Sequence, residues 1–170
     1  MSKFMANFYK TLLLLACVSM LTAFGTIMLG IGARQAGWDI PGLDAYAGFS
    51  IAAALFLALP GTLRHGDHIR VTLALQRLPE RGRTVLEYWS LGAGLALSLY
   101  LAWYACRLVW MSHLTHDVSP SADATPLWIP QIFMALGCIG FALSFVDALL
   151  ARLKDQPFFA PVAGEIARVE

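Results

Sequence analysis

Residues 11–33 read TLLLLACVSMLTAFGTIMLGIGA, a run of 23 residues without a charged side chain. Three more uncharged runs follow, at 45–63, 88–106 and 124–146. A helix of about 20 residues spans the hydrocarbon core of a bilayer, and each run has about that length. Since lipid offers no partner for backbone N–H and C=O groups, such a run must form its own hydrogen bonds as a helix. The sequence therefore predicts an all-α integral membrane protein with four transmembrane helices.

Composition agrees with this class, because 58% of the residues are hydrophobic and only 14% are charged. The first run is longer than the apolar part of a signal peptide, about 7 to 15 residues, so we expect it to stay in the protein as a helix. The connections are too short for a second folded unit, and we treat 1–170 as one membrane domain. The predicted spans are 11–33, 45–63, 88–111 and 129–149.

The Lys and Arg residues predict the orientation in the membrane. Ten of the twelve lie before the first span, between the second and third spans, or after the fourth: Lys3, Lys10, Arg64, Arg70, Arg77, Arg81, Arg83, Arg152, Lys154 and Arg168. The connection after the first span holds only Arg34, and the last connection holds no Lys or Arg. By the positive-inside rule, both termini and the Arg-rich connection are cytoplasmic.

Histidines form two pairs with i,i+3 spacing, His65 with His68 and His113 with His116. Such a spacing is found in metal and haem ligands. The predicted topology places the two pairs on opposite sides of the membrane, so they cannot share one site. We therefore interpret them as solvated histidines at the membrane surface, and we expect no cofactor, no metal and no catalytic residues. Nothing in the charge pattern suggests nucleic-acid binding.

Three charged residues lie at the edges of the predicted spans, namely Glu87, Arg107 and Asp147. Glu87 follows Arg83 by one helical turn, which allows an i,i+4 ion pair. Arg107 comes about 30 Å further along the same helix and can extend to the opposite interface. Asp147 lies near the cytoplasmic end of the last span, where the Arg-rich connection could neutralise it. These positions favour structural or partner-contact roles over an ion pathway through the membrane.

The Arg-rich connection reads RHGDHIRVTLALQRLP over residues 64–79. Val71, Ala74, Leu75 and Leu78 follow the i, i+3, i+4, i+7 spacing of one helix face. We expect an amphipathic helix at about 66–80 that lies along the cytoplasmic surface of the membrane. The alternative is an irregular basic loop that binds lipid headgroups.

The same connection resembles that of a known family. His68-Ile69-Arg70-Val71, ahead of Leu78-Pro79, is similar to a motif of the small membrane subunit of TRAP transporters, the DctQ-like proteins. The resemblance extends to the size, the four spans and the proline-marked start of the last helix at Pro126-Leu127-Trp128-Ile129-Pro130. One difference is that Asp44 is followed by Ala45, where many relatives have two adjacent acids at the start of the second span.

The resemblance implies an accessory subunit without enzymatic activity, in a bacterial inner membrane. Its expected partners are a large multi-helix permease subunit that carries the transport site, a periplasmic solute-binding protein, and membrane lipid. The transporter would import an organic acid with a sodium gradient. Candidate subunit-contact or structural residues are His68, Ile69, Arg70, Val71, Leu75, Leu78, Asp44, Glu87, Arg107, Trp128, Pro130 and Asp147.

Two other functions fit the sequence. A membrane anchor of a haem- or quinone-linked oxidoreductase would use the histidine pairs, and haem would give the purified protein a Soret band. A self-assembling channel would conduct ions when reconstituted alone. The span centres argue against independent transport, because transporters carry polar groups or broken helices at the membrane midplane. Here the centres offer mainly serine and threonine hydroxyls.

Overall fold

The computed structural model describes residues 3–65, 80–121 and 123–154, and these contain four long α-helices. They are α1 (Lys3–Gln35), α2 (Leu43–His65), α4 (Glu80–Leu114) and α5 (Trp128–Leu153). Each is long and apolar enough to cross a membrane. The described residues include no strand, only an isolated antiparallel bridge between Val118 and Pro126. The prediction of four apolar helices is confirmed, whereas the expected amphipathic helix at 66–80 falls almost entirely outside the described residues.

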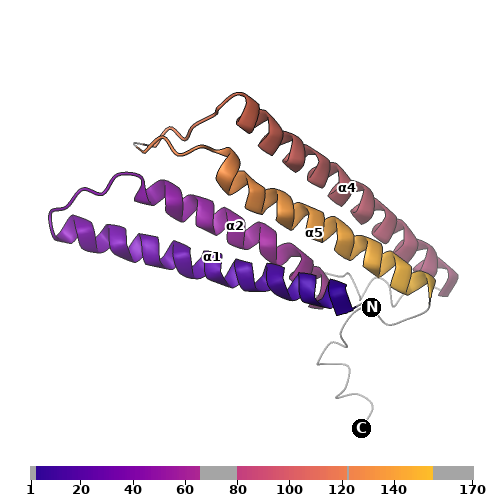
Figure 1. Cartoon of the computed structure of the whole chain (residues 1–170). Helices are drawn as coiled ribbons and strands as arrows, with labels where there is room; N and C mark the ends of the chain where they lie inside the picture. The colour runs from indigo at the N-terminus through magenta and orange to yellow at the C-terminus, as the bar shows by residue number, and fades with distance from the viewer. Residues whose placement is uncertain (1–2, 66–79, 122, 155–170) are drawn as a thin grey trace, which may run out of the picture.

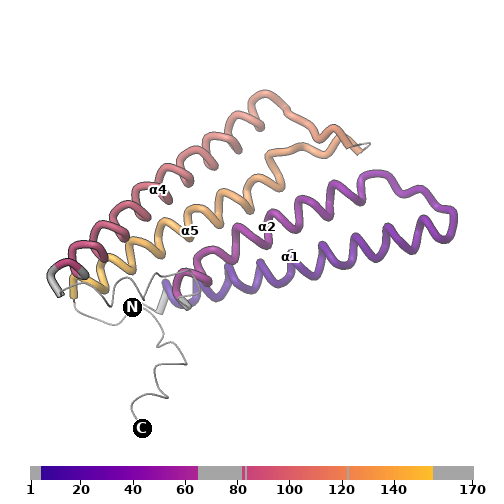
Figure 2. Tube along the Cα trace, turned by 180° about the vertical axis from the view of Figure 1, so that it is seen from behind, coloured from indigo at the N-terminus to yellow at the C-terminus, as the bar shows by residue number. Residues whose placement is uncertain are grey.

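The four helices pack as a row in the order α1, α2, α5, α4 (Figures 1 and 2). α1 and α2 form one antiparallel hairpin, and α4 and α5 form the other. The hairpins meet mainly along α2 and α5, and α1 makes a smaller contact with α5 near the basic end. The row therefore has two edge helices, α1 and α4, and each of them packs mainly against one neighbour.

Small residues let the helices approach closely. Between α4 and α5, the buried residues are mostly alanines together with Cys138. Where the hairpins meet, a Cβ on Gly137 of α5 would lie 2.4 Å from the backbone carbonyl of Phe56 in α2. A Cβ on Gly140, one turn later, would lie 2.5 Å from Leu12 and 2.9 Å from Pro60. Close backbone approach at glycine is a common way to pack transmembrane helices, and here it sets the position of α5 against α2.

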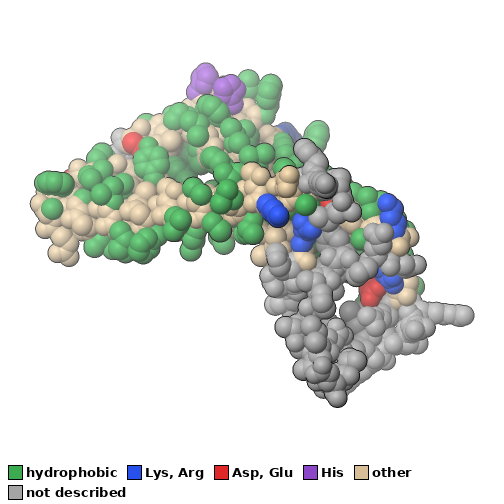
Figure 3. All heavy atoms as spheres, turned by 60° about the horizontal axis from the view of Figure 1, so that its bottom comes forward, with side chains coloured by type: hydrophobic (Ala, Val, Ile, Leu, Met, Phe, Trp, Pro, Cys, Tyr) green, Lys and Arg blue, Asp and Glu red, His purple; other side chains and the backbone are tan. Residues whose placement is uncertain are grey.

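The two ends of the row differ in charge. The first residues of α1 and α4 and the last residues of α2 and α5 lie together at one end of the molecule (Figure 1), which we call the basic end. It carries Lys10 in α1, Arg64 in α2, Arg152 in α5 and Lys154 directly after α5. In Figure 3, hydrophobic side chains cover much of the helix surfaces, and most of the Lys and Arg side chains in view lie toward that end. The distribution suits a protein whose sides face an apolar environment. Which end is cytoplasmic stays a prediction.

Candidate functional site

Half of the candidate residues from the sequence lie in the connection between α2 and α4. They are outside the described residues, and their roles stay predictions: His68, Ile69, Arg70, Val71, Leu75 and Leu78. The other six lie on the described helices or at their ends: Asp44, Glu87, Arg107, Trp128, Pro130 and Asp147.

At the basic end, Tyr9 connects three helices of the row. Its hydroxyl donates a hydrogen bond of 2.8 Å to Oδ2 of Asp147 in α5. The Arg64 guanidinium of α2 lies 4.6 Å from the centre of the Tyr9 ring, in a cation–π contact. Tyr9 is only 5% exposed, so the hydrogen bond is sheltered from water. The sequence analysis placed Asp147 near this end but did not identify Tyr9, which precedes the first span and follows no motif.

Glu87 and Arg152 connect the remaining helix to the row. Arg152 Nε of α5 lies 3.1 Å from Oε2 of Glu87 in α4, and their side chains are 34% and 27% exposed. The guanidinium also lies 5.6 Å from the centre of the Tyr88 ring. The structure pairs Glu87 with Arg152 across the α4–α5 contact; the i,i+4 pair with Arg83 that the sequence suggested stays a prediction, because the Arg83 side chain is outside the described part of the chain. Together, Tyr9, Arg64, Glu87, Asp147 and Arg152 form what we call the basic-end cluster, which contacts all four helices.

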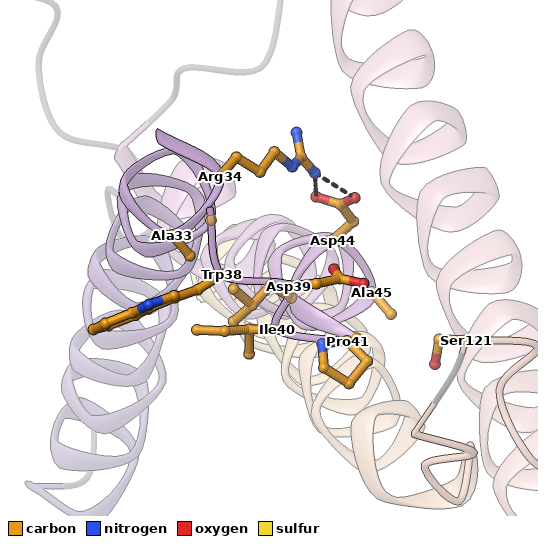
Figure 4. A pocket seen from close by; sticks show the side chains of 12 residues that line it. Ala33, Arg34, Trp38, Asp39, Ile40, Pro41, Asp44, Ala45 and Ser121 are labelled. Carbon is orange, nitrogen blue, oxygen red and sulfur yellow. Dashed lines mark hydrogen bonds and ion pairs between the residues drawn. The ribbon is translucent and has the colours of Figure 1, made fainter. Parts of the chain in front are cut away.

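At the opposite end, Asp44 at the start of α2 pairs with Arg34 at the end of α1. One guanidinium nitrogen lies 2.9 Å and 3.1 Å from the two carboxylate oxygens. Both side chains are exposed, so solvent screens the pair and its contribution to stability is small. The pair borders an open pocket of about 240 Å³. Figure 4 shows Arg34 extending toward Asp44, with Trp38 and Pro41 from the α1–α2 connection nearby.

The α4–α5 connection contacts the start of α2 through Asp123. The carboxylate accepts hydrogen bonds from the hydroxyls of Ser121 and Thr125, and Thr125 also shares a hydrogen bond of 3.1 Å with the Tyr46 hydroxyl of α2. These hydroxyls, Ser121 foremost, lower the pKa of Asp123 to about 2. Gly42, with φ +85°, lies directly against the carboxylate. We call this contact the Asp123 latch; the sequence analysis did not identify it.

The second histidine pair lies at the same end. The His113 ring packs edge-on against Trp128, with centroids 5.3 Å apart, and it lies 6.5 Å from the His116 ring. His116 has φ 52° and follows the end of α4. Pro130 is in the first turn of α5, as the proline pattern predicted. In the part of the chain that the structure describes, no three His, Cys, Asp or Glu residues group to hold a metal.

The outward face of α4 carries aromatic side chains with polar atoms. Tyr100 and Trp103 are 62% and 70% exposed, and Tyr104 is also exposed. The Tyr100 and Tyr104 rings are 4.5 Å apart. Arg107 lies on the same face and is exposed. The sequence does not reveal this face, because it does not show which side of α4 packs on α5.

Comparison with known proteins assigns the chain to a family. Residues 23–155 match the family described as tripartite ATP-independent periplasmic transporters, DctQ component. The match covers more than half of the chain, from within α1 to beyond the end of α5. It confirms the resemblance seen in the sequence, and it gives the oxidoreductase-anchor hypothesis no support. No curated protein matches the chain.

Proposed function

Because the chain belongs to the DctQ family, the small membrane component of tripartite ATP-independent periplasmic transporters, we propose that it is the scaffold subunit of a sodium-driven importer of an organic acid. Its partners are a large multi-helix permease subunit, which carries the transport site, and a periplasmic solute-binding protein. The protein lies in the bacterial inner membrane with both termini in the cytoplasm. The family match over residues 23–155 is the observation that carries this proposal.

The geometry supports a scaffold rather than a transport pathway within this chain. The helices form a row rather than a ring, so they do not surround a central channel. Two buried hydroxyls within the spans, those of Ser98 and Ser144, donate to carbonyl oxygens of their own helices. The ion pairs Arg34–Asp44 and Glu87–Arg152 lie toward opposite ends of the row. The buried hydroxyls between the helices are thus paired within the chain, whereas a solute-binding site at the midplane needs buried groups that are free to bind the solute.

Reconstitution tests the proposal. Vesicles that contain this chain alone should show no organic-acid uptake under an inward sodium gradient. Vesicles that contain the large subunit, this chain and the binding protein should take up the acid, and omission of this chain should abolish the uptake. Uptake by this chain alone, or full uptake in its absence, would contradict the scaffold role.

A further inference from the structure

α1 and α4 are the edge helices of the row, and their outward faces differ in chemistry. The exposed side chains of α1 include Leu14, Leu21 and Phe24. The hydroxyls of Thr22, which is exposed, and Thr26, which is half-buried, donate to backbone carbonyls within α1 itself. These side chains leave no hydrogen-bond donor facing outward, so this face suits contact with lipid.

The outward face of α4 differs because it presents unused donors at the middle of the membrane. Glu87 pairs with Arg152 near one end of α5, and His113 packs on Trp128 at the other end. Tyr100 lies 13 residues from both Glu87 and His113, about 20 Å along the axis in each direction. It is therefore close to the centre of a hydrocarbon core about 30 Å thick.

Tyr100 and Tyr104 both have hydroxyls that need an acceptor at this depth. Neither hydroxyl forms a hydrogen bond within residues 3–65, 80–121 and 123–154. A tyrosine side chain is too short to extend from the centre to the interface, about 15 Å away. Lipid chains provide no acceptor, so exposure to lipid would leave both donors unsatisfied.

Arg107 adds a positive charge to the same face. It follows Tyr100 by seven residues, which is two helical turns and about 10 Å along the axis. The described residues supply no ion-pair partner for it. From there Arg107 can extend to the interface, but a charge near the end of a span is more stable when a neighbouring helix pairs with it.

We propose that this face of α4, defined by Tyr100, Trp103, Tyr104 and Arg107, packs against a transmembrane helix of the large subunit. That helix presents hydrogen-bond acceptors opposite the two tyrosines and an acidic group opposite Arg107. The inference rests on the proposed function, and it selects one edge of the row as the subunit interface. The outward face of α1 is left to lipid.

Photocrosslinking in native membranes tests the choice of edge. The photoreactive residue p-benzoylphenylalanine replaces Trp103 on α4 or Leu21 on α1, which are 70% and 71% exposed and therefore matched. Each variant is co-expressed with the large subunit, and a tag on the large subunit identifies the adduct. We expect a cross-link to the large subunit from position 103 and none from position 21.

A second measurement removes only the proposed hydrogen bonds. The double variant Tyr100→Phe with Tyr104→Phe keeps both rings and removes both hydroxyls. The loss of two interhelical hydrogen bonds should weaken association of the two subunits about eightfold, measured by dilution of the solubilised complex. The control, Leu14→Ala with Leu21→Ala on α1, should associate like the wild type. Equal association of the tyrosine variant and the wild type would overturn the proposed hydrogen bonding.

The crosslinking outcomes separate the inference from the proposed function. Three outcomes would overturn the choice of edge. The large subunit could cross-link to position 21 only, or position 103 could cross-link to a second copy of this chain. The third outcome is no adduct at either position while the wild type still captures the large subunit. These three outcomes leave the proposed function intact. A wild-type chain that never captures the large subunit would contradict the proposed function itself.

Discussion

At the scale of single residues, the hydroxyl of Tyr9 makes the most sheltered polar contact of the basic-end cluster. Tyr9→Phe keeps the ring and its contact with Arg64, but it removes the donor to Asp147. Asp147 is half-buried, and leaving a sheltered acceptor without its partner costs about 1 to 3 kcal/mol. We expect the free energy of unfolding in detergent to fall by about that amount, as measured by denaturant titration of helicity.

Tyr46→Phe is the matched control for this prediction. It removes the same atom from a tyrosine whose hydrogen bond to Thr125 is exposed, where water can replace the lost partner. The expected loss is below about 0.5 kcal/mol. Equal losses in the two variants would show that burial gives the Tyr9 hydroxyl no added importance.

The sequence located part of the basic-end cluster but could not identify its pairs. A carboxylate near the end of an apolar run is recognisable, and Glu87 and Asp147 were both identified in this way. Their partners, Arg152 and Tyr9, are 65 and 138 positions away in the chain. Such pairs depend on which helices are neighbours in the row, and hydropathy does not encode that order.

At the scale of elements, the Asp123 latch connects the two hairpins away from the basic end. Gly42→Ala should weaken it, because a Cβ there would lie 2.9 Å from Asp123 Cγ and Oδ1. The left-handed conformation adds about 1 to 2 kcal/mol of strain for any residue with a Cβ. We therefore expect Gly42→Ala to lower the unfolding free energy more than Gly37→Ala, whose φ is also positive but which has open space.

Gly42→Ala in the Asp123→Ala background separates the steric contact with the Asp123 carboxylate from the backbone strain at residue 42. Without the carboxylate, the excess cost of Gly42→Ala over Gly37→Ala should shrink, leaving only the 3.3 Å approach to the Cβ of residue 123. The readout is again denaturant titration in detergent. If the effect of Gly42→Ala is the same with and without Asp123, the latch makes no steric contribution at Gly42.

The helices themselves could be predicted, but their lengths and neighbours could not. An uncharged run of about 20 residues must be helical in lipid, and this argument found all four. α4 nevertheless begins at Glu80, well before the predicted start at 88, because a helix can continue into the polar interface where charges are tolerated. Neighbour choice depends on contacts such as Gly94 against the Phe145 ring, whereas Gly92 has open space around its Cβ position.

At the scale of the whole molecule, the row arrangement supports the proposed assembly of the chain with a partner. A row of four helices buries little of its two edge helices. In the most apolar stretch of α1, and likewise of α4, 17% of the residues are buried, against 39% in that of α5. Lipid can cover an aliphatic edge, as on α1. The Tyr and Trp side chains on the edge of α4 need polar partners that lipid does not provide. We therefore expect the chain to assemble with its partner through α4 rather than through α1.

The orientation of the row gives the last prediction. Ten of the twelve Lys and Arg residues flank the basic end or lie in the terminal and Arg-rich segments, so the positive-inside rule places that end in the cytoplasm. With Cys17, Cys106 and Cys138 replaced by alanine, Ala36→Cys should react with a membrane-impermeant thiol reagent in intact cells whose outer membrane admits it. Lys154→Cys, at the basic end, should react only after the inner membrane is permeabilised. Both probe positions are exposed, so a lack of reaction reports the membrane barrier rather than burial, and the reverse labelling pattern would invert the topology.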